Sequence, residues 1–394
     1  MQFDRKIVNE IISALKTRSP LIQVIVGPRQ VGKTTAALTI AGKLGWPQVF
    51  AAADAPLPPG PEWIETQWHL ARMEKPRSDQ KTLLVLDEIQ KVQGWSETVK
   101  RLWDEEVRLK GRVRPLLLGS SALLVQRGLT ESLAGRFYLH RCMHWSWPEE
   151  QKAFGTSLDD WLYFGGYPGS MDFCDDEKKW KHYVSDSLIE TVLSKDVLQL
   201  QPVNKPVLLR HLFAMSANFP AQILSYNKML GQLQDAGNTT TLAGYVKLLE
   251  MAYLLSGLAL YSRGHVRKRG SSPKLILWNN ALIHSQSLRM RRDVVTDPVW
   301  RGHVVENAVG AHLLNGLIGP QWSITYWREG NYEIDFVVES GKSTWAIEVN
   351  SGRTGKLVGM ELFRKKYPKS QGLVIGTGGI PLETFFSRAA SEWF

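Results

Sequence analysis

The sequence predicts an α/β fold in which a parallel sheet carries helices on both faces, followed by helical segments and a second, C-terminal α/β segment. Short apolar runs bounded by Gly, Pro or polar residues recur before residue 147, and helical patterns separate most of them. From about Trp147 the periodicity becomes helical. Strands that alternate with helices indicate crossover connections and therefore a parallel sheet.

Five apolar runs are the predicted strands of this sheet, because four to eight consecutive apolar residues suit a strand that is covered on both faces. They span residues 21–26, 48–52, 82–86, 113–118 and 136–140. Residues 3–17 precede them with apolar positions at helical spacing. The Pro-rich stretch 55–61 is expected to be a loop inside this domain, since the alternation resumes after it.

Helical patterns dominate the middle of the chain. Residues 176–200 show long helical periodicity, and residues 207–262 are predicted as three helices, the third after the start signal at 238–241. Two strand candidates, 257–261 and 274–278, follow and are joined by a basic tip. Three helices and a basic hairpin are typical of a winged helix-turn-helix.

The last segment mixes one helix with several strands. The predicted helix spans residues 304–317, and the predicted strands span residues 324–327, 333–338, 345–349 and 372–375. No apolar stretch reaches the roughly 20 residues that cross a bilayer, so we expect no membrane span. The first ten residues lack the apolar core of a secretory signal, which favours a cytoplasmic protein.

The charge is unevenly distributed along the chain. Residues 1–200 contain 26 Lys and Arg against 25 Asp and Glu, whereas residues 201–394 contain 22 against 13. This asymmetry fits a nucleic acid or an acidic protein as partner of the second half. The two cysteines, Cys142 and Cys174, are too few for a disulfide framework or a zinc site, and no role is predicted for them.

A glycine-rich phosphate-binding pattern follows the first predicted strand and opens a helix. The sequence GPRQVGKTT spans residues 27–35, and its glycines let successive backbone N–H groups point inward at a helix N-terminus. Lys33 is predicted to reach the β- and γ-phosphates, and Thr34 to bind Mg²⁺. The predicted nucleotide-binding residues are Gly27, Pro28, Arg29, Gln30, Val31, Gly32, Lys33, Thr34 and Thr35.

Two carboxylates end the predicted strand LLVLDE, at the edge of the sheet where ligands bind in open α/β folds. Asp87 is predicted to hold Mg²⁺ with Thr34, and Glu88 to polarise the attacking water. Taken alone, two acids at a strand end are often solvated turn residues. Their spacing of about 50 residues from the phosphate loop favours the catalytic interpretation.

These motifs resemble the AAA-type P-loop ATPases, in particular prokaryotic ones that carry a winged helix and a nuclease-like C-terminal domain. GPRQVGKTT and LLVLDEIQ carry the resemblance, and LLLGSSALL, SLAGRF, YFGGYP and SPKLILWN support it weakly. The resemblance implies ATP with Mg²⁺ and a polar sensor at Ser120 or Ser121. It also implies that Arg136 is an arginine finger donated to a neighbouring subunit, and hence a homo-oligomer. The alternatives are a turn-capping Ser pair and a surface ion pair of Arg136.

The resemblance also implies four domains. They are an ATPase core at 1–147, a helical lid at 148–202, a winged helix at 203–280 and a restriction-endonuclease-like domain at 281–394. In the winged helix, the basic tip is expected to contact DNA phosphates without reading bases. The tip residues concerned are Arg263, His265, Arg267, Lys268 and Arg269. A purely structural lid is the alternative, because Lys247 and Glu250 are the only charges of the third helix.

The C-terminal segment resembles the nuclease core at EIDFVV and WAIEVNSG. Carried over, Asp335 and Glu348 are candidate ligands of a second metal ion, with Glu306 assisting. Asn350 stands where the nuclease pattern has a lysine, and Asn supplies no positive charge, so we expect a degenerate domain that does not cleave. Lys356, in the following loop, is the candidate substitute for the missing lysine.

Three functions remain open at this stage. The first is an ATP-hydrolysing protein that couples its nucleotide state to DNA or to a partner protein. The second is a nucleotide-gated switch with little turnover. The third is a metal-dependent nuclease that ATP regulates.

Overall fold

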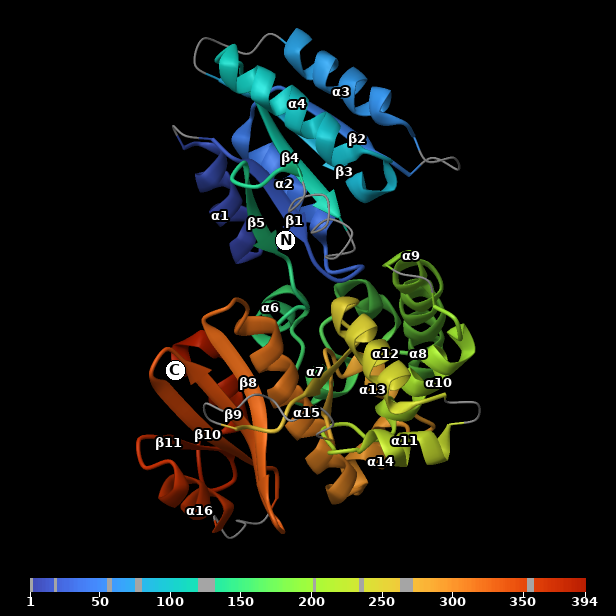
Figure 1. Ribbon diagram of the computed structural model, residues 1–394, viewed down its shortest axis with the longest axis vertical. Coiled ribbons are helices and arrows are strands. Elements are labelled where there is room, and N and C mark those ends of the chain that lie inside the picture. The colour runs from blue at the N-terminus through green and yellow to red at the C-terminus, as the bar shows by residue number, and fades with distance from the viewer. Residues whose placement is uncertain are drawn as a thin grey trace. The chain divides into compact units, whose positions relative to one another are not determined.

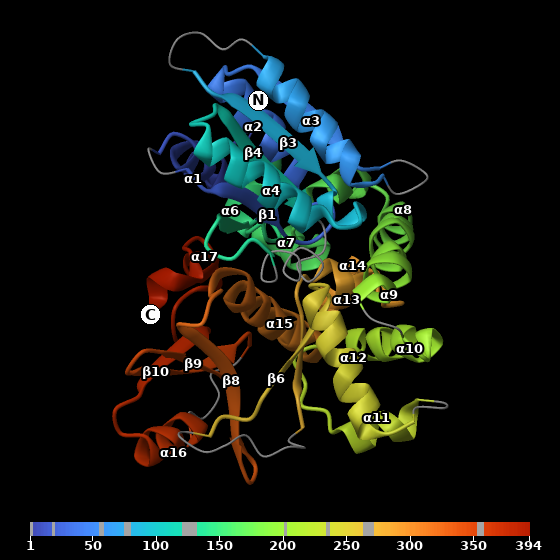
Figure 2. The same cartoon turned by 45° about the horizontal axis from the view of Figure 1, so that its top comes forward.

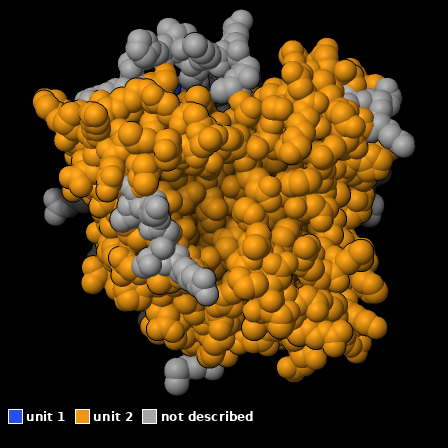
Figure 3. All heavy atoms as spheres, turned by 90° about the horizontal axis from the view of Figure 1, so that it is seen from below, with its two compact units in different colours: residues 1–143 blue, residues 144–394 orange. Residues whose placement is uncertain are grey.

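The structure is a computed structural model and describes residues 3–17, 20–54, 59–74, 80–119, 132–200, 203–233, 237–262, 272–352 and 358–394. It consists of two compact units, residues 1–143 and residues 144–394 (Figure 1). Figure 3 shows one face of the second unit, in orange. The boundary lies close to residue 147, where the sequence changes to helical periodicity. The boundaries predicted at 202 and 280 lie within the second unit.

The first unit is built on a five-stranded sheet with the order β2-β3-β4-β1-β5, and every neighbouring pair is parallel. The strands are β1 (Ile22–Val26), β2 (Gln48–Ala52), β3 (Thr82–Asp87), β4 (Val113–Gly119) and β5 (Phe137–Arg141). All residues of β1, β3 and β4 are buried, as their continuous apolar runs predict. The predicted parallel sheet and its five strands are confirmed.

Helices cover both faces of this sheet (Figure 1). They are α1 (Lys6–Leu15), α2 (Lys33–Leu44), α3 (Pro61–Met73) and α4 (Trp95–Arg108), with the short turn η1 (Ile89–Lys91) after β3. On one face, Ile11 and Ile40 of α1 and α2 pack against the sheet. On the other, Trp68 and Trp103 of α3 and α4 do so. Burial of both faces fixes the ends of β1 and β3, which carry the predicted site.

The second unit begins with helices. They are α6 (Trp147–Phe154), α7 (Leu158–Phe164), η2 (Pro168–Phe173), α8 (Glu177–His182), η3 (Tyr183–Ile189), η4 (Val192–Asp196) and α9 (Val197–Leu200). Ser146 caps α6 through a capping box with Glu149, which explains why the helix begins there. The predicted helix at 176–200 is present, with π-helical turns in η3 and η4.

Three further helices and a hairpin follow, as predicted, although the first hairpin strand lies at 255–258 instead of 257–261. They are α10 (Pro206–Ala217), α11 (Tyr226–Gln232), α12 (Thr239–Met251), β6 (Leu255–Leu258) and β7 (Lys274–Leu277). Asn238 caps α12 by accepting a hydrogen bond from the Thr241 amide. The stretch 221–224, between α10 and α11, pairs with β7 on the side opposite β6: the amides of Ala221 and Leu224 donate to carbonyls on or next to β7.

The C-terminal part contains a second sheet with the order β11-β10-β9-β8, and a long helix packs on it (Figure 2). The strands are β8 (Trp322–Glu329), β9 (Tyr332–Ser340), β10 (Ser343–Asn350) and β11 (Gln371–Gly376). The helices are α13 (Ala281–His284), α14 (Arg291–Thr296), α15 (Pro298–Gly316), α16 (Val358–Lys366), α17 (Leu382–Phe386) and η5 (Ala390–Trp393). Only β10 and β11 run parallel; β8, β9 and β10 form antiparallel neighbours.

Within the residues described above, none of the helices combines the length and the apolar character that a membrane span requires.

Candidate functional site

The phosphate loop connects the end of β1 to the start of α2, in the first unit. Gly32 is the N-cap of α2 with φ +86°, and its carbonyl accepts the Ala36 amide at 2.8 Å. Gln30 also has a positive φ of +57°, so the chain curls tightly between strand and helix. Gly27 permits this path, because a Cβ there would lie 1.9 Å from the Cys142 carbonyl oxygen. The loop thus presents its backbone at a helix N-terminus.

The Lys33 ammonium is turned into the curl of this loop. Its Nζ donates to the Gly27 carbonyl at 3.0 Å and to the Pro28 carbonyl at 2.5 Å. Burial lowers the pKa of Lys33, and the negative charges of Glu88 and Asp87 oppose that shift. A buried cation inside a ring of backbone groups, at the start of a helix, fits the phosphate tail of a nucleotide.

The predicted Mg²⁺ residues lie in contact. The Thr34 hydroxyl donates to Asp87 Oδ2 at 2.6 Å, and Asp87 Oδ1 accepts the Glu88 amide at 2.8 Å. Thr34 follows the loop on α2, whereas Asp87 ends β3, so two separate elements deliver an oxygen each to one place. Hydroxyl and carboxylate oxygens are the ligands that Mg²⁺ prefers, and the pair fits that ion.

Glu88 is held in an unusual backbone conformation beside this pair. Its φ is +53°, in the left-handed region that non-glycine residues seldom adopt. Gln90 Nε2 donates to Glu88 Oε2 at 2.7 Å, which orients the carboxylate. A carboxylate kept in a costly conformation next to the Thr34–Asp87 pair is suited to position a water molecule.

Two residues support the loop from behind, and sequence reasoning missed both. Arg5 Nη1 donates to the Val31 carbonyl at 3.2 Å and to the Met143 carbonyl at 3.0 Å. It also lies 3.1 Å from the Cys142 thiol, which is buried at the end of β5 under the loop. Neither residue belongs to the phosphate-binding pattern, so only the fold shows that they touch it.

Arg136 lies at the other end of the sheet from the phosphate loop. It precedes β5, and its carbonyl accepts the amide of Ile22, the first residue of β1. Its guanidinium makes a bidentate pair with Asp104 of α4, with Nε to Oδ1 at 2.7 Å and Nη2 to Oδ2 at 3.1 Å. About a third of the Arg136 side chain is exposed. It therefore does not reach the phosphate site of its own chain.

Several predicted site residues lie outside the described residues. They are Ser120, Ser121, Arg263, His265, Arg267, Lys268, Arg269 and Lys356. Strand β4, which precedes the serines, ends at Gly119 in register with Val26 of β1.

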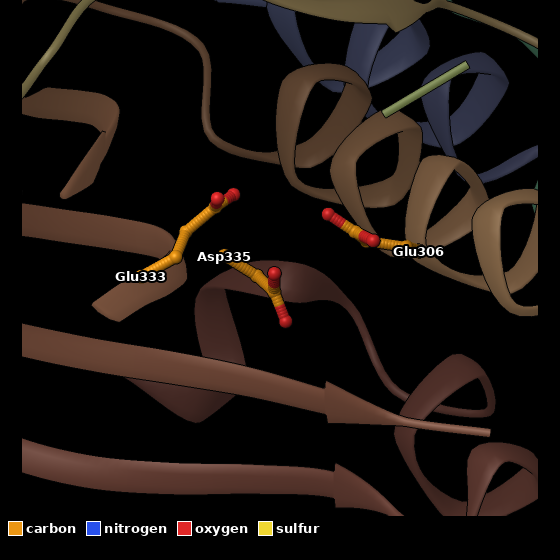
Figure 4. Close-up of side chains that lie close together, drawn as sticks. All are labelled: Glu306, Glu333 and Asp335. Atoms are coloured by element: carbon orange, nitrogen blue, oxygen red, sulfur yellow. The ribbon is translucent and has the colours of Figure 1, made fainter. Parts of the chain in front are cut away.

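In the second unit, carboxylates of the C-terminal part converge from a helix and a strand. Glu306 of α15 and Glu333 and Asp335 of β9 point toward one another, and one oxygen of each lies within 4.8 Å of the others (Figure 4). Asp335 Oδ2 also accepts the Val349 amide at 2.8 Å. Of the three predicted ligands, the structure thus brings Glu306 and Asp335 together, and it adds Glu333. We refer to Glu306, Glu333 and Asp335 as the carboxylate cluster.

A lysine from the hairpin occupies the middle of the carboxylate cluster. Lys274, the first residue of β7, has no exposed surface, and its Nζ lies 2.5 Å from Glu306, 3.0 Å from Glu333 and 3.1 Å from Asp335. Burial alone depresses its pKa, but the carboxylates outweigh burial and raise it. The sequence pattern gave no sign of this contact, because a lysine before an apolar strand is usually a surface residue.

Glu348 of β10 lies near this cluster without joining the trio. Burial raises its pKa to about 8, and the negative charge of Asp335 adds to the shift. Burial and Asp335 also raise the pKa of Glu306. Both shifts favour the neutral, protonated form of these carboxyl groups, and burial is their main cause. Asn350, two residues after Glu348 on β10, contributes no charge to this region.

Comparison with known families identifies the first unit. Residues 19–150 match the family described as AAA domain. Together with the parallel sheet and the phosphate loop, this match defines that part of the chain as an AAA-type P-loop nucleotide-binding domain, as the sequence motifs predict. Residues 155–293 match a domain of unknown function, DUF8612, and residues 301–386 match another, DUF4143. The endonuclease-like nature of the C-terminal part is not confirmed by these matches.

Two curated relatives resemble the chain at low identity. An uncharacterized protein of Methanocaldococcus jannaschii is 23% identical over 65% of this chain, and the match spans 58% of that protein's length. An uncharacterized protein of Haemophilus influenzae is 24% identical over 83% of this chain and 82% of its own length.

Solved structures resemble the chain only loosely. The match to Aeropyrum pernix ORC1 in complex with DNA covers 73% of this chain and 93% of the ORC1 chain, at 12% identity and a TM-score of 0.31. The match to the Thermotoga maritima RuvB Holliday junction branch migration motor covers 68% of this chain and 93% of the RuvB chain, at 14% identity and a TM-score of 0.35.

Proposed function

We propose that the first unit binds ATP with Mg²⁺ and hydrolyses it to ADP and phosphate. The observation that carries the proposal is the contact between Thr34 and Asp87 at 2.6 Å, beside a phosphate loop that already encloses the Lys33 ammonium. Residues 27–35 would hold the phosphates, with Lys33 against the β- and γ-phosphates. Thr34 and Asp87 would hold Mg²⁺, which neutralises phosphate charge when bound.

Glu88 is the residue that we assign to water activation. Its carboxylate follows Asp87 directly and is oriented by Gln90, so it can accept a proton from a water placed in line with the γ-phosphate. Ser120 or Ser121, which follow β4, is proposed as the polar sensor of the γ-phosphate.

The test is a comparison of three variants in nucleotide-binding and turnover assays. Lys33→Ala is expected to lose nucleotide binding, and Glu88→Gln to bind ATP but turn over at least roughly 100-fold more slowly. Lys43→Ala is the matched control, because Lys43 lies on the same helix and only pairs with Asp4 at the surface, at 2.6 Å. Unchanged hydrolysis in both Lys33→Ala and Glu88→Gln would remove the proposal.

We further propose that the nucleotide state is coupled to DNA or to a partner protein through residues 203–280, acting as a winged helix. The pairing of 221–224 with β7, next to β6, supports a winged helix, because a short strand between the first two helices completes its small sheet. Helix α12 buries Leu242, Tyr245, Val246, Leu248 and Leu249. Contact with DNA would therefore be electrostatic and would rest on Arg263, Arg267, Lys268 and Arg269 of the tip.

Gel-shift titration of duplex DNA across a salt series tests this second proposal. Alanine at the four tip residues should weaken binding equally for unrelated sequences and reduce the slope of log K against log salt. A control variant, Lys178→Ala on the exposed surface of α8 and outside residues 203–280, should change the slope little. If wild-type protein fails to bind DNA even at low salt, the coupling partner is a protein instead.

A further inference from the structure

The carboxylate cluster satisfies all three hydrogen-bond donors of the Lys274 ammonium. An ammonium has three N–H donors, and the Lys274 Nζ lies within 2.5 to 3.1 Å of three carboxylate oxygens, one from each acid. The same Nζ lies 5.2 Å from the centroid of the Phe336 ring, so an aromatic face closes another side. The cation is thus coordinated by its surroundings as a bound ion would be.

The position of this ammonium coincides with the position that a metal ion would take. A Mg²⁺ or Ca²⁺ ion bound by Glu306, Glu333 and Asp335 would lie between their oxygens, which are within 4.8 Å of one another. The Lys274 Nζ already lies there. A divalent ion at the centre of the trio would meet this nitrogen at less than contact distance, so only one of the two cations fits.

The backbone around Lys274 holds it in this place. It is the first residue of β7, where it faces Leu258 of β6 and Ile223 on the other side. Helix α15 is bonded to the other end of β7. The Asn307 side chain accepts a hydrogen bond from the Leu277 amide at 2.9 Å and donates one to the Leu277 carbonyl at 3.0 Å. Consecutive residues of α15, Glu306 and Asn307, thus contact the two ends of one strand.

We propose that the Lys274 ammonium is the resident cation of the carboxylate cluster, in place of a divalent metal ion, and that the cluster serves to fasten the β6–β7 hairpin to α15 and β9. It follows that the C-terminal part does not carry out metal-dependent cleavage of nucleic acid. The proposal stands independently of ATP hydrolysis in the first unit.

The experiment measures thermal midpoints of the full chain without nucleotide, with and without 1 mM Mn²⁺ at matched ionic strength. Mn²⁺ should change the thermal midpoint of the wild-type protein by no more than it changes that of Asp335→Asn. Lys274→Ala should have a lower midpoint in the absence of metal and should gain a Mn²⁺-dependent rise of at least about 3 °C, because it leaves the carboxylates without a cation. The rise should vanish in Lys274→Ala with Asp335→Asn.

Two controls separate this effect from general destabilisation and from metal at the phosphate site. Lys342→Ala removes an exposed lysine at the turn between β9 and β10 and should respond to Mn²⁺ as the wild-type protein does. Lys274→Met fills most of the volume without the charge; it should be destabilised and respond to Mn²⁺ less than Lys274→Ala. Binding at Thr34 and Asp87 is insensitive to Asp335→Asn, so the double variant identifies the site.

If Lys274→Ala does not fold, Mn²⁺ binding to the wild-type chain and to Asp335→Asn, followed by electron paramagnetic resonance, decides the question. Equal binding by the two supports the proposal. Mn²⁺ binding that is lost in Asp335→Asn, or nicking of supercoiled DNA that is lost in the same variant, would overturn it. A folded Lys274→Ala variant that gains no response to Mn²⁺ would overturn it as well.

Discussion

The Thr34 hydroxyl donates a hydrogen bond to Asp87 across 2.6 Å, and so joins the start of α2 to the end of β3. Both oxygens are proposed Mg²⁺ ligands. Removal of one should therefore weaken the binding of Mg²⁺ more than the binding of the nucleotide. Thr34→Val should raise the Mg²⁺ concentration for half-maximal turnover by about 10-fold or more, whereas Thr34→Ser should leave it nearly unchanged. A Mg²⁺ titration of turnover provides the measurement. Identical curves for Thr34→Val and wild type would exclude Thr34 as a ligand.

Gly27 and Gly42 form a matched pair for testing the phosphate loop. A Cβ at Gly27 would lie 1.9 Å from the Cys142 carbonyl oxygen, whereas a Cβ at Gly42 of α2 meets no atom within 4 Å. Gly27→Ala should therefore destabilise the protein by about 1–3 kcal/mol and abolish nucleotide binding. Gly42→Ala should stabilise it by about 0.5–1 kcal/mol, because alanine is the better helix former. Urea denaturation of both variants, with nucleotide titration, checks the pair.

Arg136 can be tested as a trans-acting residue by mixing inactive variants. If Arg136 completes the site of a neighbouring copy, Arg136→Ala and Glu88→Gln should each hydrolyse ATP slowly. A mixture of the two variants should recover part of the turnover. In a mixed oligomer, an Arg136→Ala subunit keeps Glu88 and can receive the Arg136 of a Glu88→Gln neighbour. Asp104→Ala serves as the control, since it breaks the ion pair with Arg136 but keeps the guanidinium. Absence of recovery, with equal loss in Asp104→Ala, indicates that Arg136 acts only in the ion pair.

Buried histidines predict a loss of stability in mild acid. Burial lowers the pKa of His284 to about 3 and that of His140 to about 4, below the unfolded value near 6.5. Between these values the unfolded chain binds more protons, so stability should fall as the pH decreases from about 6.5, by up to about 1.4 kcal/mol per pH unit for each group. Below the folded pKa the contribution levels off.

Denaturation curves between pH 8 and pH 4.5 measure this slope. His284→Phe removes one titrating group and keeps a ring to stack on Tyr163, 4.2 Å away between centroids. The variant should have a shallower pH dependence, whatever its stability at pH 8. A slope equal to that of the wild type would show that His284 does not contribute.

The parallel sheet was predictable because local features determine it. Runs such as Leu83 to Leu86 are apolar throughout, and a strand covered on both faces requires that composition. The phosphate loop and the acids after β3 were predictable for the same reason, since each lies within a short motif whose residue types the chemistry demands.

Lys274 shows what the sequence does not reveal. The nuclease pattern predicts a lysine at the position of Asn350, yet the lysine that contacts the acids is Lys274 of the β6–β7 hairpin, 59 residues before Glu333. No periodicity records such a contact, since it depends on how β7 and β9 come together. The same holds for Arg5, which contacts Val31 because α1 packs beside the loop.

The sequence distance between Lys274 and its acidic partners also matters while the chain is being made. Glu333 and Asp335 follow Lys274 by 59 and 61 residues, a lag of roughly 3 to 12 s at ordinary ribosomal elongation rates. Until they emerge, burial of the lysine would cost far more than the hairpin contacts return. The hairpin can therefore bury Lys274 fully only after the chain has been made past residue 335, and a nascent chain stalled before residue 332 keeps that amine in water.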